Sequence, residues 1–153
     1  MRRFKLLLLA LVAMSSLSLS AQNVYTAAFI GAKSDGTTNN TGSIQAGIDS
    51  LSSKGGGTIE FYVGRYVIGT IYLKDNVTID LKEGAVLVGT KSPYDYQYVD
   101  GNSALIIADG IKNASIIGKG VIEGTATELI SNFDKQEEAG NLAKGCEDRP
   151  SLI

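Results

Sequence analysis

The sequence predicts an all-β fold, a right-handed parallel β-helix whose first coils lie under a short capping α-helix. Between Gly55 and Gly89 the chain consists of short β-rich segments, mostly of four or five residues, that end at Gly, Asp-Asn or Lys-Glu-Gly. The gaps between them are too short for the helices of βαβ units, and they lack the Asn-Gly and Asp-Gly turns of hairpins. The predicted strands are Thr58–Tyr62, Tyr66–Ile68, Thr70–Leu73, Val77–Leu81 and Ala85–Val88.

The alternation of side chains within these segments indicates which face of each strand is buried. In Val77–Leu81, Val77, Ile79 and Leu81 share one face, whereas Thr78 and Asp80 share the other. A chain that coils with its Val, Ile and Leu inside, and its Thr, Asp and Lys outside, stacks each strand on the turn below. This arrangement is a parallel β-helix.

Two asparagines precede strands of this coil. Asn76 stands before Val77, and Asn113 stands before a second run of the same pattern that ends at Gly124. An asparagine side chain carries both a donor and an acceptor. We expect both side chains to be buried and to bond the backbone of the neighbouring coil.

A helix over Thr41–Leu51 is predicted to cover the first coil. Asn40 or Thr41 can cap its N-terminus, and Lys54-Gly55 ends it. Its apolar residues fall at i, i+4 and i+7, on one face. A β-helix needs such a lid because its end exposes apolar side chains and unpaired strand edges. The residues of this face are Ile44, Ile48 and Leu51.

Segments on either side of this central part complete the prediction. Gly31–Gly36 is predicted to be a turn, and Lys91–Gly101 a loop between coils. The tyrosines of that loop, Tyr94, Tyr96 and Tyr98, could form a sugar-stacking platform, but a role in covering the flank of the coil is favoured. Further strands are predicted at Asn23–Phe29, Leu105–Ala108, Ala114–Ile117 and Val121–Glu123.

The polar composition of Thr125–Asp148 predicts an excursion from the coil with one helical turn at most. Arg149–Ile153 resembles the start of the next strand. We therefore expect the domain, residues 22–153, to be the N-terminal part of a longer β-helix that is truncated at its C-terminus. The last coil would then leave interior residues such as Ile107 and Ile117 uncovered.

Several short motifs together resemble glycoside hydrolase family 28, the polygalacturonase and rhamnogalacturonase group. The resemblance spans residues 28–153 and implies the lid, the β-helix and inverting hydrolysis of α-1,4-linked galacturonic acid chains. The motifs that carry it are Asp35-Gly36, Ile44–Asp49, Gly55–Ile59, Gly64–Tyr66, Leu73–Thr78, Glu83–Ala85, Gly118–Gly124 and Arg149-Pro150.

The first 21 residues have the layout of a secretory signal peptide. Arg2, Arg3 and Lys5 precede the apolar run Leu6–Met14, whose nine residues are too few to span a bilayer that needs about 20. Cleavage after Ala21 would export the chain to the periplasm or the medium, with no membrane anchor. It would leave eleven Lys and Arg against sixteen Asp and Glu, a charge of −5, which argues against nucleic acid as a partner.

The residues that the resemblance implies for catalysis are missing from the chain. The related enzymes act through aspartates in Asn-Thr-Asp and Asp-Asp motifs, assisted by Gly-His-Gly and Arg-x-Lys. None of these occurs in residues 22–153, and the 153 residues include no His. The one Arg-x-Lys of the sequence, Arg3-Phe4-Lys5, lies in the predicted signal peptide. We therefore expect the catalytic residues after Ile153. The carboxylate pairs present are predicted to be solvated, and they are Asp80 with Glu83, Glu137 with Glu138, and Glu147 with Asp148.

No metal or cofactor site is predicted, because no loop alternates Asp and Asn as a Ca²⁺ loop does. The single cysteine, Cys146, cannot form an internal disulfide, and it has few basic neighbours to activate it. It could pair with a cysteine outside the sequence or remain reduced.

The predicted function is that of the N-terminal part of an exported pectin-degrading hydrolase. Its partner would be a pectic polysaccharide, polygalacturonate or rhamnogalacturonan, and the full-length enzyme would be a monomer. Two alternatives remain: a non-catalytic β-helix, such as an adhesin or a tail spike, and a pectate lyase on the same fold. The 153-residue chain itself is expected to be inactive.

Overall fold

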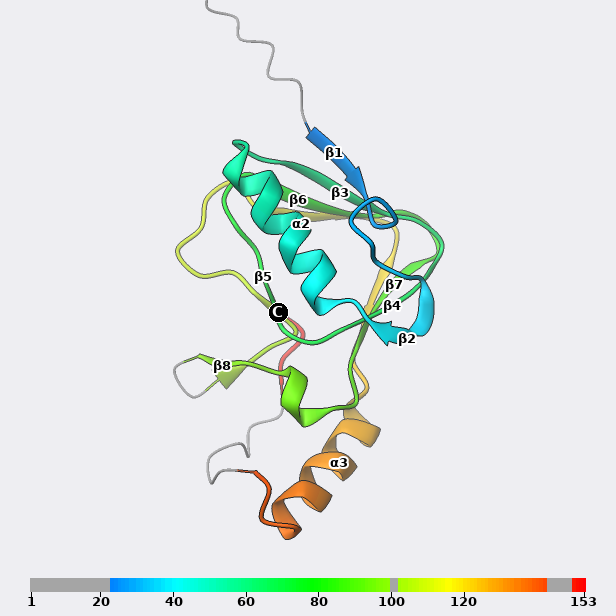
Figure 1. Ribbon diagram of the computed structural model, residues 1–153, viewed down its shortest axis with the longest axis vertical. Coiled ribbons are helices and arrows are strands. Elements are labelled where there is room, and N and C mark those ends of the chain that lie inside the picture. The colour runs from blue at the N-terminus through cyan, green and yellow to red at the C-terminus, as the bar shows by residue number, and fades with distance from the viewer. Residues whose placement is uncertain (1–22, 100–101, 143–149) are drawn as a thin grey trace, which may run out of the picture.

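The computed structural model describes residues 23–99, 102–142 and 150–153, and it shows a parallel β-helix (Figure 1). Sheet A contains strands in the order β1, β3, β6 and β11, and sheet B in the order β2, β4, β7 and β12. Sheet C pairs β5 with β10, and every pair in these three sheets is parallel. The bounds are β1 Asn23–Thr26, β2 Asp35–Asn39, β3 Gly57–Phe61, β4 Gly64–Ile68, β5 Ile71–Tyr72, β6 Val77–Leu81, β7 Ala85–Gly89, β10 Ile106–Ile107, β11 Ser115–Gly118 and β12 Val121–Glu123.

The inward-facing residues of successive coils lie in register and form the core. In sheet A, Ile59 pairs with Ile79, and Ile79 pairs with Ile116. Ile59 and Ile79 have no exposed surface. Val77, Ile79 and Leu81 are all buried, whereas Thr78 and Asp80 are only partly covered. The alternation read from the sequence is thus confirmed, and with it the parallel β-helix.

Asn76 and Asn113 stack at equivalent turns, but the prediction that they are buried is wrong. Both are exposed, and the Asn113 side-chain N–H donates to Asn76 Oδ1 at 3.1 Å, so the contact joins two side chains. Both residues have positive φ, 61° and 56°, a conformation that asparagine tolerates better than most residues. These positions therefore favour asparagine because of the turn geometry and not because of a buried polar network.

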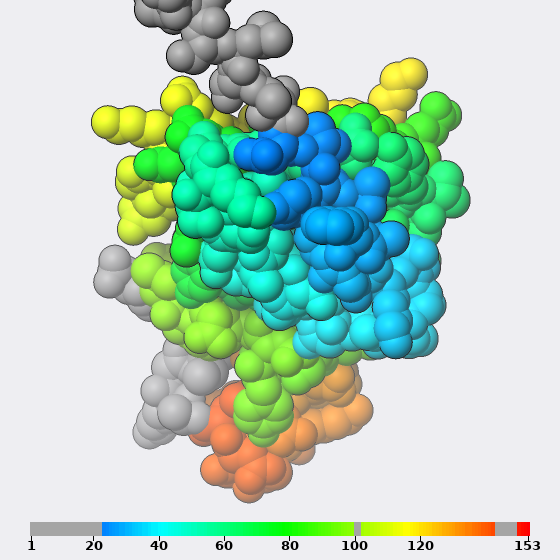
Figure 2. Space-filling view, turned by 45° about the horizontal axis from the view of Figure 1, so that its top comes forward, coloured from blue at the N-terminus to red at the C-terminus, as the bar shows by residue number. Residues whose placement is uncertain are grey.

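The lid is α2, Thr41–Ser53, and it crosses the N-terminal end of the coil (Figures 1 and 2). Its own residues Ile44, Ile48 and Leu51 are fully buried on the face toward the coil, as predicted. Gly55 and Gly56 end the helix: their N–H groups bond the carbonyls of Ser52 and Leu51, the paired bonds of a Schellman motif.

The N-terminus of α2 is held differently from the prediction. Asn40 occupies the cap position but makes no capping bond. Its side chain instead bonds the backbone of Lys33 and Thr38, and so holds the preceding segment against the helix. Thr41 Oγ1 accepts a bond from the backbone N–H of Gly69, which ties the first turn of the lid to the next coil.

The segments between the coils differ most from the sequence prediction. β1 ends at Thr26, three residues before the predicted end, and the predicted turn Gly31–Gly36 runs into β2. The loop after β7 contains a 3-10 turn, η2 (Pro93–Asp95), and an antiparallel hairpin of β8 (Tyr98–Val99) with β9 (Asn102–Ser103).

The excursion after β12 was predicted to contain at most one helical turn, but it forms α3, Ala126–Glu138, with 13 residues. Leu129 is buried, and Phe133, one turn later, packs against the core. Leu129 and Phe133, at i and i+4, thus form the face by which this mostly polar helix packs on the coil.

The end of the described chain begins a further rung of sheet C. Leu105 and Ile106 donate backbone bonds to the carbonyls of Ser151 and Leu152, at 2.9 and 3.2 Å. The prediction that this segment starts the next strand holds for these residues. Ile107 and Ile117, however, were placed on the wrong face. Their neighbours Ile106 and Ile116 point inward, in register with Ile71 and Ile79, and Ile117 is half exposed.

Four sequence predictions lie outside the described residues: the signal peptide 1–21, Cys146, the carboxylate pair Glu147 with Asp148, and Arg149 of the last motif. Among the residues that the structure describes, no helix has the length and apolar character needed to cross a membrane.

Candidate functional site

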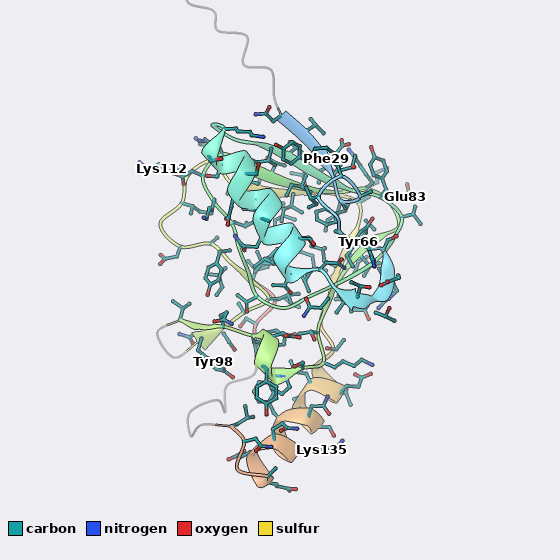
Figure 3. All side chains as sticks on the ribbon, in the orientation of Figure 1. Phe29, Tyr66, Glu83, Tyr98, Lys112 and Lys135 are labelled. Carbon is teal, nitrogen blue, oxygen red and sulfur yellow. The ribbon has the colours of Figure 1, made fainter. Side chains whose placement is uncertain are left out.

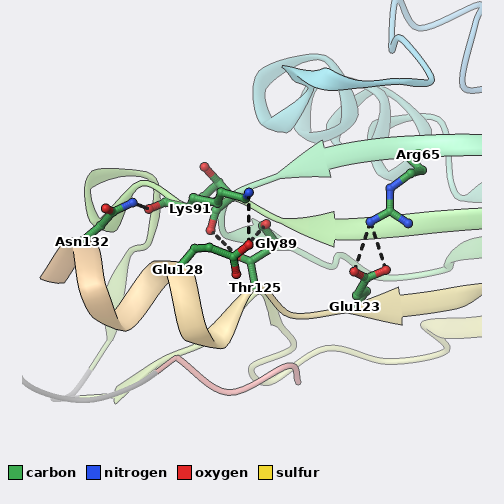
Figure 4. A network of polar contacts seen from close by, with 8 residues as sticks. Arg65, Gly89, Lys91, Glu123, Thr125, Glu128 and Asn132 are labelled. Carbon is green, nitrogen blue, oxygen red and sulfur yellow. Dashed lines mark hydrogen bonds and ion pairs between the residues drawn. The ribbon is translucent and has the colours of Figure 1, made fainter.

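A groove of about 780 Å³ lies on the outer face of sheet B, between the segment around Gly36 and helix α3. Figure 4 shows the polar contacts of several residues that line it. Its floor is mainly apolar, with Val67 and Val88 facing outward from adjacent strands. Its margins are polar. They carry Thr37, Arg65, Thr90, Lys91, Ser92, Glu123, Thr125, Glu128 and Asn132.

Arg65 and Glu123 meet across the floor of the groove. Arg65 faces outward from β4 and Glu123 from β12, with β7 between them. Nη2 of Arg65 donates to both carboxylate oxygens of Glu123, at 3.1 and 3.0 Å. The side chains are 49% and 44% exposed, so water competes with this ion pair.

A second ion pair fixes α3 to the coil. Lys91 Nζ lies 3.3 Å from Glu128 Oε1, and the Asn132 amide donates to the backbone carbonyl of Lys91 at 2.8 Å. Thr125, just before the helix, donates its hydroxyl to the carbonyls of Gly89 and Thr90. The pKa of the Glu128 carboxyl is lowered, first by the backbone N–H of its own residue and then by Lys91. Glu128 is therefore a carboxylate and not a proton donor at neutral pH.

This arrangement favours binding over acid–base chemistry. Each of its two carboxylates bonds a cation, whereas a general acid must be protonated at the working pH. The groove offers two partly exposed cations, hydroxyl and amide side chains, and an apolar floor. Saccharides with acidic groups present complementary chemistry, because they combine carboxylates, hydroxyls and apolar C–H faces.

The tyrosines considered for sugar stacking do not form a common platform. Tyr96 is buried and donates its hydroxyl to the carbonyl of Thr90, and burial raises its pKa to about 12. Tyr94 is exposed and donates to Gln136 Oε1 of α3. Tyr98 lies in the β8 hairpin, away from α3 (Figure 3). The loop thus covers the flank of the coil and supports the helix.

The carboxylate pairs identified from the sequence do not form an active site in the described chain. Asp80 and Glu60 both bond Lys82, while Glu83 points outward at a turn (Figure 3). Glu137 and Glu138 are exposed on α3, and Glu147 and Asp148 lie outside the described residues. No group of three His, Cys, Asp or Glu within the described ranges could hold a metal ion.

Sequence reasoning did not identify the groove. Arg65 and Glu123 are 58 residues apart, and only the register of three strands brings them together. One signal was available: Arg65 directly precedes the predicted strand Tyr66–Ile68, and Glu123 ends the predicted strand Val121–Glu123. Placing those strands in adjacent coils would have shown the two charges on one face.

Comparisons with known proteins show that the chain is similar to part of a curated galacturonosidase. It is 32% identical over 130 residues to an exo-poly-α-D-galacturonosidase of Dickeya chrysanthemi, a match that covers 72% of this chain and 21% of the relative. The chain thus spans about a fifth of the curated relative. No family model matches it.

Solved structures show the same fold. A protein of Parabacteroides merdae assigned as a glycosyl hydrolase superposes with a TM-score of 0.80 and 45% identity, over 86% of this chain and 57% of the other. The family 28 exopolygalacturonase of Yersinia enterocolitica superposes at 0.71 with 26% identity, over 86% of this chain and 32% of the enzyme. An exopolygalacturonase of Thermotoga maritima is similar in fold, with a TM-score of 0.67 and 23% identity. The match covers 86% of this chain and 38% of that enzyme.

Proposed function

The chain is similar to family 28 glycoside hydrolases in sequence and in fold, and from this premise we propose that it is the N-terminal part of an exported exopolygalacturonase. The whole protein would hydrolyse α-1,4-galacturonosyl bonds of pectic polysaccharide with inversion. The observation that carries the proposal is the 32% identity over 130 residues to an enzyme named for this activity. The lid and coils of the described chain would supply the scaffold of that enzyme.

We propose that the chemistry uses residues beyond those that the structure describes. An inverting glycosidase uses a protonated carboxyl and a carboxylate roughly 6.5–9.5 Å apart, with a water between them. Here Lys74 lowers the pKa of Asp49, Lys82 lowers that of Glu60, and that of Glu128 is lowered as well. These groups are ionised at neutral pH and cannot act as the acid. We place the catalytic aspartates in a continuation of the polypeptide after Ile153.

Export is also part of the proposal, and it depends on the layout of residues 1–21. Expression of the complete gene in its host, followed by N-terminal sequencing of the secreted or periplasmic protein, would test it. A mature N-terminus at Gln22 supports cleavage after Ala21. A protein that stays in the cytoplasm with Arg2 intact contradicts it.

The activity is tested by comparing the complete protein with the 153-residue chain. We expect the complete protein to release reducing sugar from polygalacturonate and the chain alone to release none above a buffer control. Proton NMR of the first products should show inverted anomers. Products that absorb in the ultraviolet would indicate the lyase alternative, and an inactive complete protein would favour a non-catalytic β-helix. Release of reducing sugar by the chain alone would show that it contains an active carboxylate pair.

A further inference from the structure

We propose that the groove on sheet B is a binding site for the carboxylates of an oligogalacturonate chain, with Arg65 and Lys91 as the cations that contact them. The inference rests on the proposed function for the choice of sugar. It concerns residues of this chain only.

The first argument is the position of the two cations along the strands. Arg65 is in register with Val86, and Lys91 follows five residues later in the same direction. At about 3.3 Å per extended residue, their backbones are separated by roughly 15 Å. This span exceeds one sugar ring, so the groove suits an oligosaccharide better than a single galacturonate.

The second argument is that Glu123 occupies the place that a ligand carboxylate would take. Both its oxygens bond Nη2 of Arg65 (Figure 4). A guanidinium is well suited to bind a planar carboxylate. Its remaining N–H donors allow Arg65 to bind a ligand carboxylate in place of the Glu123 carboxylate. Because both side chains are about half exposed, this ion pair is weak, and opening it costs little free energy. The same exchange is available at Lys91, whose side chain is 60% exposed.

The third argument is the surface between the cations. Val67 and Val88 give an apolar floor on which C–H groups of sugar rings can pack. Thr37, Ser92 and Asn132 stand at the margins and carry groups that can bond sugar hydroxyls. A small inorganic anion would use only the cations, whereas a uronate chain would use the floor and margins as well.

The test is a calorimetric titration of the purified chain with trigalacturonate at low salt, with neutral galactotriose as the comparison ligand. Arg65→Gln is expected to weaken trigalacturonate binding about fivefold or more. Glu123→Gln is expected to tighten it about threefold, because it frees Arg65 from an internal competitor. The two variants have opposite expected signs, so a general loss of folding cannot imitate the result.

A matched control exists elsewhere on the chain. The Lys74–Asp49 ion pair has a distance of 2.9 Å and side-chain exposures of 47% and 47%, close to those of Arg65 and Glu123, but it does not line the groove. Lys74→Gln should leave binding unchanged. Equal affinity of the wild type and Arg65→Gln, or equal binding of galactotriose and trigalacturonate, overturns the proposal.

The result can be separated from the outcome of the activity assay. If the complete protein hydrolyses polygalacturonate but Arg65→Gln does not alter binding, the groove assignment alone is wrong. If the chain binds trigalacturonate through Arg65 but the complete protein has no hydrolase activity, the binding site stands and the proposed function fails.

Discussion

The two ends of the β-helix differ in how their interior residues are covered. At the N-terminal end, α2 lies over the first coil and Ile44, Ile48 and Leu51 have no exposed surface. At the other end, Ile116 of β11 and Ile122 of β12 are only partly buried, although their partners in the preceding coil, Ile79 and Leu87, are fully buried. Figure 2 shows the N-terminal end covered by β1, the segment that follows it, and α2.

The difference shows that an inward position in a β-helix is buried only when a further layer covers it. Ile59, Ile79 and Ile116 occupy equivalent places in sheet A, yet only the first two are shielded on both sides. Ile59 is shielded by β1, in which Tyr25 is its partner, and by α2, in which Gly47 faces it. Within the described ranges, no strand pairs with the outer edge of β11 or β12.

The largest effect is expected from a deletion of core volume at the covered end. Ile48→Ala should lower the free energy of unfolding by about 2–5 kcal/mol, because it removes fully buried methyl groups and leaves a cavity. Ile116→Ala should cost less than about 2 kcal/mol, since its side chain is already partly solvated. Denaturant melts of both variants give the comparison. A loss below about 0.5 kcal/mol for Ile48→Ala would mean that α2 does not act as a lid.

The next prediction concerns the two edges of sheet A. We expect the isolated chain to self-associate through β11, because an unpaired strand edge templates pairing with another chain. Ile117 on β11 and Val24 on β1 are 51% and 53% exposed, and they stand on opposite edges of the same sheet. Ile117→Lys should weaken association about tenfold or more, while Val24→Lys should leave it nearly unchanged.

Sedimentation velocity over a range of concentrations measures this association directly. If Val24→Lys is the variant that restores a monomer, the chain associates through the edge of β1 and not through the edge of β11. A wild-type chain that sediments as a monomer and melts cooperatively would show that the described coils are self-sufficient.

The parts of the fold that the sequence could predict are those with a clear apolar period. β6 and β12 were predicted with their observed bounds, and α2 was predicted from three apolar residues on one face. The strand β2 was missed because Asp35–Asn39 contains no apolar residue. It is held by pairing with β4 and by bonds from the backbone of Thr37 and Thr38 to the Asp35 carboxylate.

Tertiary contacts account for the other misses. α3 carries few apolar residues, and it forms because Leu129 and Phe133 meet the flank of the coil while Lys91 bonds Glu128 and Asn132. The groove was missed for the same reason. Its charges come from β4, the segment after β7, β12 and α3, and no local pattern connects them. The resemblance to an enzyme family, by contrast, was visible in the order of short motifs alone.

The smallest effects should come from the two glycines of the lid, and they measure how closely α2 is seated on the coil. A Cβ on Gly47 would lie 3.0 and 3.1 Å from two carbons of Ile30 and 3.3 Å from Ile59 Cδ1, whereas a Cβ on Gly42 would meet nothing within 4 Å. Alanine at either position gains helix propensity, but only at Gly47 must neighbours move. We therefore expect Gly42→Ala to stabilise the chain by about 0.5 kcal/mol and Gly47→Ala to destabilise it by about 1 kcal/mol. Denaturant melts that show both variants stabilised would mean that α2 rests loosely on the coil, and that a helical lid seals this end less tightly than a further coil would.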